Sequence, residues 1–419
     1  MADPPADAGK LADLHALLEV SCQLGAGSEL GPILHTIEQA SLRVLGCERT
    51  TIFLYDRHND ELYSRVATGQ EGIRFPAGRG IAGEAFHGRA VINVPDAYAD
   101  PRFNPEVDRR TGFTTRNLLT CPLLGIDRKP VGVLQALNKR RGTFDAWDEE
   151  LVRTLGAQAG VAVQRQMLID EFVEKQRIQE DLRIAHDIQQ RLLPRRPPLV
   201  LGYDIAGWNE PADETGGDFY DLQLLDSGPL AVTIADVTGH GVGPALIASE
   251  CRALLRASLS LTQNLERVLA LVNDLLNVDL PDDRFVTAFV GLLSPATHEF
   301  TYISAGQGPL FHFRAATREV TELPTSGLPL GVLPARSYEL SRPTVFEPGD
   351  MLAFLTDGFL EWPDSERNRL GVEGVTELLK KYHALPAAVL IEEVHREVRE
   401  FARGTPQQDD LTAVVIKRV

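Results

Sequence analysis

The spacing of hydrophobic residues changes twice along the 419-residue chain. Residues 10–166 mix helical spacing with the two-residue alternation of strands, and 148–193 then have the pattern of one long helix without proline. From Gly202 onward, short strands alternate with turns rich in glycine and aspartate. Prolines between 194 and 198 end the helix, because proline lacks the amide proton that a helix needs. We therefore predict three parts: a first domain over 10–166, a helical linker over 167–196 and a second domain over 197–419.

The first predicted domain begins with helices and continues as a sheet. A helix around Leu14 is followed by a second helix over about 32–45. Strands, recognised as β-branched and apolar residues between turn formers, are predicted at 50–55, 62–67, 118–123 and 131–138. Helices that precede a sheet in this way predict an α+β fold.

Composition argues against secretion and against a membrane span. No stretch approaches the roughly 18 uninterrupted apolar residues of a membrane helix. The first ten residues lack the apolar core of a signal peptide. The four cysteines are far apart and form no C-x-x-C pair, which is typical of buried thiols in a reducing cytoplasm. We predict a cytoplasmic protein.

Charge narrows the choice of partner. The net charge of −17 repels nucleic acid and anionic lipid. The chain also shows no DNA-binding motif, so a transcription factor is excluded. We expect no nucleic-acid partner.

Acidic residues recur where predicted strands of the second domain meet glycine-containing turns. The four segments are Gly216-Gly217-Asp218, Asp236-Val237-Thr238-Gly239, Thr356-Asp357-Gly358 and Asp409-Asp410. One such aspartate commonly only satisfies a backbone amide. Four strands that each deliver an aspartate concentrate like charge, which costs free energy unless cations neutralise it.

The ligand type indicates which cation these aspartates would hold. Oxygen ligands without a nearby cysteine favour Mg²⁺ or Mn²⁺ over zinc. Two such ions can share a water, lower its pKa and direct it at a phosphorus atom. The four segments therefore favour hydrolysis of a phosphate ester.

The same segments resemble, in order and in local sequence, the motifs of the PPM (protein phosphatase 2C-like) family, in its bacterial SpoIIE/RsbU branch. Ser304-Ala305-Gly306, the segment 327–331 and the segment 348–351 add further matches. The resemblance covers about residues 200–419. It implies a metal-dependent protein serine/threonine phosphatase, with a central β-sandwich and helices outside at 242–261, 265–278, 373–382 and 387–401.

The resemblance also implies individual roles. It places Asp218 and Asp236 as bridges between two Mn²⁺ or Mg²⁺ ions, with the carbonyl of Val237 as a backbone ligand. Asp357 and Asp409 complete the coordination. The residues implied to stand near the ions, or to hold a third one, are Asp221 and Asp410. The implied substrate is a phosphoprotein, a STAS-type anti-sigma-factor antagonist.

Two departures and one alternative accompany this resemblance. Gln307 stands where the branch often has histidine, and the segment 208–211 offers no phosphate-binding arginine. His240 is either the acid that protonates the leaving serine or simply a turn residue beside the site. The alternative function is a non-catalytic signalling scaffold with a cyclic-nucleotide-responsive sensor. The presence of every ligand aspartate favours the enzyme.

The first domain resembles a GAF domain over roughly 155 residues. The resemblance rests on the segment 78–83, on the strand 130–136 and on an N-K-x(4)-F-x(3)-D-E pattern typical of cyclic-nucleotide-binding GAF domains. The residues of that pattern are Asn138, Lys139, Phe144, Asp148 and Glu149. The family implies that they brace the domain and do not touch the nucleotide. A cyclic nucleotide, another small ligand, and a purely structural or dimerising role all stay open.

The linker carries a short heptad pattern. Its positions, spaced alternately by four and three residues, are Ile178, Leu182, Ala185, Gln189 and Leu192. This pattern predicts a parallel two-helix stalk and hence a homodimer. The alternative is a single helix that packs on its own phosphatase domain.

Overall fold

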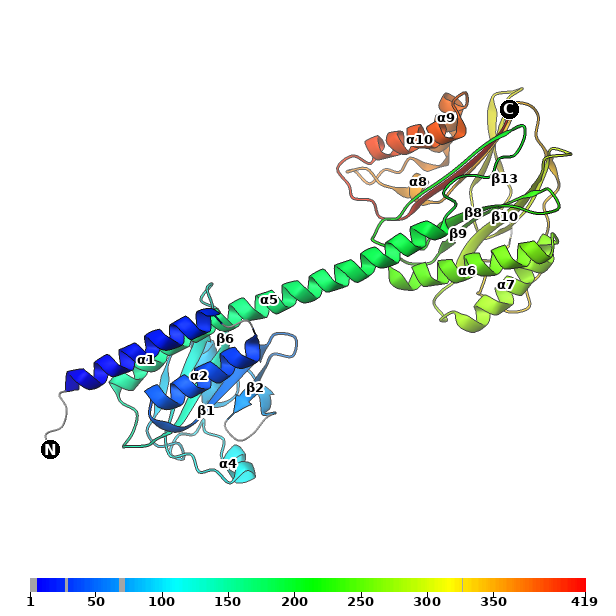
Figure 1. The fold of residues 1–419 in the computed structure, drawn as a ribbon. Helices are drawn as coiled ribbons and strands as arrows, with labels where there is room; N and C mark the ends of the chain where they lie inside the picture. The colour runs from blue at the N-terminus through cyan, green and yellow to red at the C-terminus, as the bar shows by residue number, and fades with distance from the viewer. Residues whose placement is uncertain (1–5, 27–28, 68–71, 326) are drawn as a thin grey trace. The chain divides into compact units, whose positions relative to one another are not determined.

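The computed structural model describes residues 6–26, 29–67, 72–325 and 327–419. The chain forms two compact units, Met1–Arg177 and Ile178–Val419. Helix α5 (Ala146–Leu192) contributes residues to both units (Figure 1). Within the described ranges, no helix is long and apolar enough to cross a membrane.

The first unit is built on a six-stranded antiparallel sheet with the strand order β3-β2-β1-β6-β5-β4. Its strands are β1 (Cys47–Asp56), β2 (Glu61–Ala67), β3 (Arg74–Pro76), β4 (Ile92–Val94), β5 (Leu118–Leu124) and β6 (Pro130–Lys139). Its helices are α1 (Ala6–Ala26), α2 (Leu30–Val44), α3 (Gly80–Gly88), α4 (Glu106–Thr111) and the first part of α5. The four predicted strands correspond to β1, β2, β5 and β6, and the α+β fold is confirmed.

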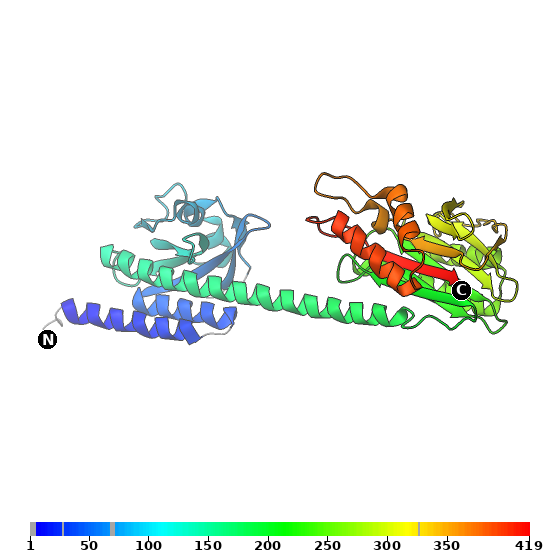
Figure 2. The ribbon, with the colours of Figure 1, turned by 90° about the horizontal axis from the view of Figure 1, so that it is seen from above.

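Helices α1, α2 and the first part of α5 cover one face of this sheet (Figure 2). Ile37 of α2, Ile52 of β1 and Leu155 of α5 are fully buried in the shared core. Burial of each such side chain stabilises the fold by roughly 1.5–3 kcal/mol. Gly160 of α5 allows the helix to approach β5 closely, since a Cβ atom there would lie 2.2 Å from the carbonyl oxygen of Leu124.

The second unit contains two five-stranded antiparallel sheets, with the orders β14-β11-β10-β9-β8 and β13-β12-β15-β16-β7. The strands of the first sheet are β8 (Phe219–Leu224), β9 (Leu230–Val237), β10 (Val286–Ser294), β11 (Glu299–Ala305) and β14 (Thr344–Val345). Those of the second are β7 (Tyr203–Glu210), β12 (Leu310–Arg314), β13 (Glu319–Leu323), β15 (Met351–Leu355) and β16 (Leu411–Arg418).

Helices cover the outer faces of this β-sandwich (Figure 1). The pair α6 (Val242–Leu261) and α7 (Leu265–Asp279) packs on the first sheet, and the pair α9 (Gly371–Tyr382) and α10 (Ala387–Phe401) packs on the second. A short helix, α8 (Gly358–Glu361), follows β15. The four predicted outer helices are therefore present at the predicted positions.

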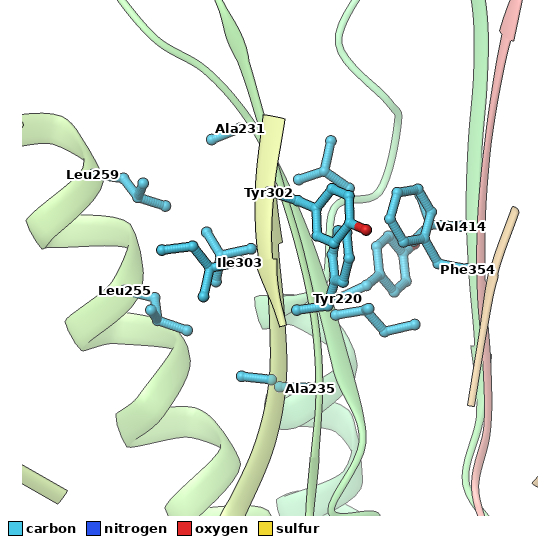
Figure 3. Close-up of a cluster of buried hydrophobic side chains, with 14 of the residues drawn as sticks. Tyr220, Ala231, Ala235, Leu255, Leu259, Tyr302, Ile303, Phe354 and Val414 are labelled. Carbon is cyan, nitrogen blue, oxygen red and sulfur yellow. The ribbon is translucent and has the colours of Figure 1, made fainter. Parts of the chain in front are cut away.

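Strand alternation separates the core between the sheets from the core under the helices (Figure 3). Tyr302 of β11 points toward Phe354 of the opposite sheet, and its neighbour Ile303 points toward Leu255 of α6. Phe289 lies between the sheets, with its ring 4.8 Å from the rings of both Tyr302 and Phe354. This aromatic layer fixes the two sheets against each other and thereby fixes the strand ends that carry the aspartates.

The last turns of α5 pack on the second unit. Gln189 is buried, and His186 Nδ1 lies 2.7 Å from the carbonyl oxygen of Glu214. At this end the heptad face is therefore occupied by the chain's own domain, as in the single-helix alternative, because the Gln189 amide finds backbone partners there. Large apolar side chains farther up α5 are exposed, among them Leu168 and Phe172. The homodimer predicted through the heptad positions Ile178, Leu182, Ala185, Gln189 and Leu192 stays a prediction.

Candidate functional site

The predicted aspartates stand at strand ends of the two sheets. Asp218 directly precedes β8, and Asp236 lies at the end of the neighbouring strand β9. In the other sheet, Asp357 follows β15 as the N-cap of α8, and Asp409 and Asp410 precede the neighbouring strand β16. We refer to these five residues as the carboxylate cluster.

Backbone hydrogen bonds tie the two halves of the carboxylate cluster together. Asp410 Oδ2 accepts from the amide of Asp218 at 3.1 Å, and Asp410 Oδ1 accepts from the amide of Ala212 at 2.8 Å. Gly216 touches the same carboxylate, since a Cβ atom there would lie 2.3 Å from Asp410 Oδ2. Asp410 therefore fixes the backbone that carries Asp218.

The environment of Asp218 and Asp236 disfavours negative charge. Burial is the main reason why the pKa of Asp218 lies well above its usual value, and the negative charges of Asp236 and Asp410 raise it further. Burial, together with the smaller contribution of the negative charges of Asp357 and Asp409, raises the pKa of Asp236 to about 7. Asp218 Oδ2 is buried and has no hydrogen-bond partner among the described residues. An unpaired buried carboxylate oxygen is costly, so it indicates a missing partner.

The other strand ends repeat this pattern. Burial raises the pKa of Asp357, with Glu361 as the next cause, and burial likewise raises the pKa of Asp409, with a further contribution from Asp357. Carboxyls that raise one another's pKa in this way can ionise together only when a cation neutralises them.

The residues of the carboxylate cluster fit divalent cations. The carbonyl oxygen of Val237 lies beside Gly217, the residue before Asp218, since a Cβ atom on Gly217 would lie 2.6 Å from it. Within the described ranges, no three side chains of His, Cys, Asp and Glu already converge into a ready-made metal group. Mg²⁺ requires no such group, because it keeps several waters and takes only one or two carboxylates from the protein. Hard oxygen donors together with one unpaired buried oxygen suit Mg²⁺ or Mn²⁺.

Asp221 does not join the carboxylate cluster. Its carboxylate binds Arg256 Nη1 at 2.6 and 2.7 Å and lies 3.4 Å from Arg252 Nη2. Both arginines belong to α6, on the outer face of the first sheet. The position of Asp221 therefore does not support the role near the ions that was expected for it, because the side chains of Arg252 and Arg256 already neutralise its carboxylate.

His240 and Gln307 lie at the edge of the site. His240 is exposed, and its Nδ1 lies 2.7 Å from Asp213 Oδ2. Gln307 is buried and accepts a hydrogen bond from Thr287 Oγ1. Thr287 is paired with Asp236 across β9 and β10, so Thr287 links Gln307 to the site.

Two threonines that sequence reasoning missed support Asp218. Thr356 and Thr412 are both fully buried, and both side chains partly offset the rise of the Asp218 pKa. The Thr412 amide donates to Thr356 Oγ1 at 2.9 Å, which joins β15 to β16. The signal was available, because each threonine adjoins an aspartate motif, directly before Asp357 and two residues after Asp410.

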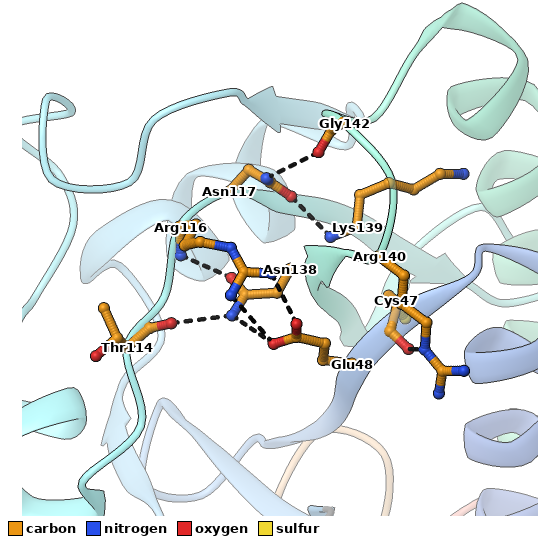
Figure 4. A network of polar contacts seen from close by, with 9 residues as sticks. All are labelled: Cys47, Glu48, Thr114, Arg116, Asn117, Asn138, Lys139, Arg140 and Gly142. Atoms are coloured by element: carbon orange, nitrogen blue, oxygen red, sulfur yellow. Dashed lines mark hydrogen bonds and ion pairs between the residues drawn. The ribbon is translucent and has the colours of Figure 1, made fainter.

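In the first unit, the N-K-F-D-E residues form internal braces, and Figure 4 shows the contacts of the Asn138 side chain and of the Lys139 backbone amide. Asn138 adopts a left-handed conformation (φ 57°), and its side-chain amide donates to Glu48 Oε2 and to the Thr114 carbonyl oxygen, both at 2.9 Å. Lys139 Nζ binds Asp148 Oδ1 at 2.5 Å. The side-chain amide of Asn93 donates to Phe144 O at 3.0 Å and to Glu149 Oε1 at 2.9 Å.

A cavity of about 370 Å³ lies elsewhere in this unit. In the part of the chain that the structure describes, its wall contains none of the five N-K-F-D-E residues. The wall combines the rings of Phe53, Phe75 and Phe113 with Arg49 and Arg79, and it also contains Glu106 and Asp108. Arg74 lies in the wall too, but it already pairs with Asp56 and Glu61. The first turn of α3 also faces it, with Gly80 and Ile81 in the wall. Such a lining suits an anionic ligand with a flat apolar part.

The brace between Lys139 and Asp148 leads to a stability prediction. Lys139→Ala leaves the buried Asp148 carboxylate without its cation and should lower the free energy of unfolding of the first unit by about 2 kcal/mol. Lys129→Ala is the control, because Lys129 is exposed and its ion pair with Asp127 is 3.6 Å long. Differential scanning calorimetry of the full chain measures both. Equal effects would contradict the bracing role.

Comparison with known proteins matches both units. The family model described as stage II sporulation protein E matches residues 226–419, and the GAF domain model matches residues 29–163. The phosphoserine phosphatase RsbU of Bacillus subtilis is 26% identical over 245 residues, which cover 58% of this chain and 72% of that protein. A probable 3',5'-cyclic phosphodiesterase of Caenorhabditis elegans, pde-5, is 31% identical over 160 residues, which cover 35% of this chain and only 21% of that protein.

A solved structure supports the fold of the second unit. The SiaA-PP2C domain of Pseudomonas aeruginosa matches with a TM-score of 0.51 and 22% identity, over 58% of this chain and 98% of that one. Both resemblances predicted from the sequence are thereby confirmed. The chain contains a GAF domain at residues 29–163 and a SpoIIE-type PPM phosphatase domain at residues 226–419.

Proposed function

We propose that this chain is a metal-dependent protein serine/threonine phosphatase whose activity is regulated by its GAF domain. The observation that carries the proposal is the carboxylate cluster, in which buried carboxyls raise one another's pKa and Asp218 Oδ2 has no partner among the described residues. It lies where strand ends of the two sheets meet, and most of it belongs to the part of the chain that matches the SpoIIE family. A scaffold that only bound a partner would gain nothing from burying several carboxyls close together, which costs free energy.

The proposed ligands follow from these positions. Asp218 and Asp236 would lie between two Mn²⁺ or Mg²⁺ ions, with the carbonyl of Val237 beside them and with Asp357 and Asp409 on the side of the second sheet. When bound, such ions supply an activated water and neutralise charge on the phosphoryl oxygens. Asp410 keeps Asp218 in place through the Asp218 amide.

His240 is the proposed proton donor to the leaving serine oxygen. Nδ1–H donates to Asp213, so in the imidazolium form Nε2–H is the donor left for the leaving oxygen, and the ring becomes neutral after the transfer. The exposure of the imidazole allows a protein substrate to reach it.

The proposed substrate is a phosphoserine on a STAS-type anti-sigma-factor antagonist. The similarity to RsbU, a phosphoserine phosphatase, supports the phosphoserine, and the resemblance to the SpoIIE/RsbU branch supports the STAS-type protein. For the GAF domain we propose a cyclic nucleotide. The arginines in the wall of the cavity suit a phosphate, and its aromatic rings suit a base.

Phosphate release from a phosphorylated STAS-type protein tests the proposal directly. We expect the full chain to release phosphate with Mn²⁺ present, EDTA to abolish the release, and added cGMP or cAMP to change its rate. A phosphotyrosine peptide is the control substrate and should be hydrolysed more slowly. No release from any phosphoserine substrate, with Mn²⁺ bound, would favour the scaffold. Hydrolysis that responds to neither nucleotide would remove only the cyclic-nucleotide assignment.

A further inference from the structure

The side chain of Gln189, near the C-terminal end of α5, makes two hydrogen bonds to one residue. Its Nε2 donates to the carbonyl oxygen of Gly216 at 2.6 Å, and its Oε1 accepts from the amide of Gly216 at 3.2 Å. The side chain is buried, and because donor and acceptor are both used, the orientation of the amide is fixed. The helix therefore holds Gly216 at both polar groups of its backbone.

Gly216 connects this contact to the carboxylate cluster. It packs directly against the carboxylate of Asp410, with no room for a Cβ atom between them. The same Asp410 oxygen accepts the amide hydrogen of Asp218 at 3.1 Å. A movement of Gly216 therefore displaces Asp410, and with it the backbone that positions Asp218.

Two further contacts of the helix end enclose this segment. His186 Nδ1 lies 2.7 Å from the Glu214 carbonyl oxygen, two residues before Gly216. Tyr220 Oη donates to the Pro194 carbonyl oxygen at 3.2 Å, two residues after Asp218. The helix end and the segment that follows it thus hold 214–220 at three points, and the Gln189 contact is the central one.

We propose that Gln189 is a positioning residue for the metal centre, through which α5 sets the affinity of the carboxylate cluster for its cations. The proposal rests on the proposed function for the identity of those cations. Gln189 itself touches neither substrate nor ion. With the Gln189 contact formed, Gly216 and Asp410 hold Asp218 in the cation-binding position; with the contact broken, the same ligands bind more weakly.

Calorimetric titration of the full chain with Mn²⁺ tests the proposal. Gln189→Leu keeps the size of the buried side chain and removes both hydrogen bonds. We expect its Mn²⁺ affinity to fall on the order of tenfold, which corresponds to about 1.4 kcal/mol. Amide hydrogen exchange in the peptide that contains Gly216 should become faster. The Mn²⁺ concentration that gives half-maximal turnover should rise by the same factor, while turnover at saturating Mn²⁺ stays near that of the wild type.

Two variants control the measurement. Gln189→Glu still accepts from the Gly216 amide but places a carboxylate oxygen against its carbonyl oxygen, so its Mn²⁺ affinity should fall at least as far as that of Gln189→Leu. Arg191→Leu changes an exposed side chain at the same helix end and should leave Mn²⁺ affinity unchanged. If Gln189→Leu does not fold, Gln189→Glu decides by the same titration.

Unchanged Mn²⁺ affinity together with faster exchange at Gly216 would overturn the proposal. A lower unfolding temperature with unchanged Mn²⁺ affinity would overturn it as well, because Gln189 would then be only a packing contact. The titration needs no hydrolysis. A shifted Mn²⁺ affinity in a protein without phosphatase activity would therefore contradict the proposed function and still support the role of Gln189.

Discussion

Asp236→Asn should lower phosphatase turnover of the full chain by several orders of magnitude, and Asp357→Asn should do the same. Each substitution keeps the shape of the side chain and removes one negative charge from the carboxylate cluster. The activated water and the neutralisation of the phosphoryl group both depend on the cations that this charge holds. Phosphate release at saturating Mn²⁺ measures the loss. EDTA should reproduce it, and added Mn²⁺ should restore turnover in the wild type alone.

In the absence of metal, Asp236→Asn should raise the stability of the protein and not lower it. Burial and the neighbouring carboxyls raise the pKa of Asp236 from 3.8 to about 7. A carboxyl with a higher pKa in the folded state contributes stability below its unfolded pKa, and this contribution is lost as pH rises through the folded pKa. Metal-free wild-type protein should therefore lose stability between about pH 4 and pH 7 through this group, whereas asparagine loses none.

Thermal unfolding in EDTA checks this sign. Asp236→Asn should unfold at the same temperature as the wild type near pH 4 and at a higher temperature near pH 8, the range that spans both pKa values. Mn²⁺ should stabilise the wild type more than the variant, because a ligand stabilises the state that binds it. Turnover that persists in either asparagine variant, or a lower unfolding temperature of the metal-free variant at pH 8, would contradict the assignment of these carboxyls.

Much of the second domain could be predicted because its elements carry strong local signals. Helices α6 and α10 begin and end at the residues that the family resemblance implied, and their neighbours Gly241 and Pro386 agree with these bounds. Strands β3 and β4 were missed, because each has only three residues and too short an alternation to recognise. The sheet order needed the structure, since β15 pairs with both β12 and β16 across long loops.

The heptad in the linker shows a different limit. Its spacing correctly marks Gln189 as a position on the buried face of α5. Spacing cannot distinguish a second copy of the helix from the chain's own domain, because both offer a surface to the same face. The polar residue in the pattern was the useful signal. A buried amide needs partners for its donor and its acceptor, and a backbone segment such as Gly216 supplies both.

Asp221 was placed near the ions because it stands three residues after Asp218 in the same motif. Strand alternation argues otherwise, since residues separated by an odd number point to opposite faces of a sheet. Phe219, Asp221 and Gln223 face the side of α6, together with Arg252. The closeness of Asp221 to Asp218 in the sequence therefore suggested the same face of the sheet. The two-residue period of the strand would have given the correct face.

Asp221→Asn should consequently affect stability and leave the chemistry intact. The carboxylate is buried, and its partner Arg252 is nearly so, with a pKa that burial already lowers. Loss of the carboxylate leaves Arg252 uncompensated, and we expect the free energy of unfolding to fall by about 3 kcal/mol. Arg256 adds less to this loss, because its side chain is 44% exposed and water screens its charge.

Denaturant unfolding of the full chain measures the change, with Asp226→Asn as the control. Asp226 is an exposed aspartate in the turn after β8, so its substitution should change stability by no more than about 0.5 kcal/mol. Turnover per folded molecule and Mn²⁺ affinity of Asp221→Asn should match the wild type, in contrast to Asp236→Asn. A loss of Mn²⁺ affinity with unchanged stability would return Asp221 to the metal centre. The stability loss predicted here would instead show that its two arginines, and not a cation, are the reason this carboxylate can be buried.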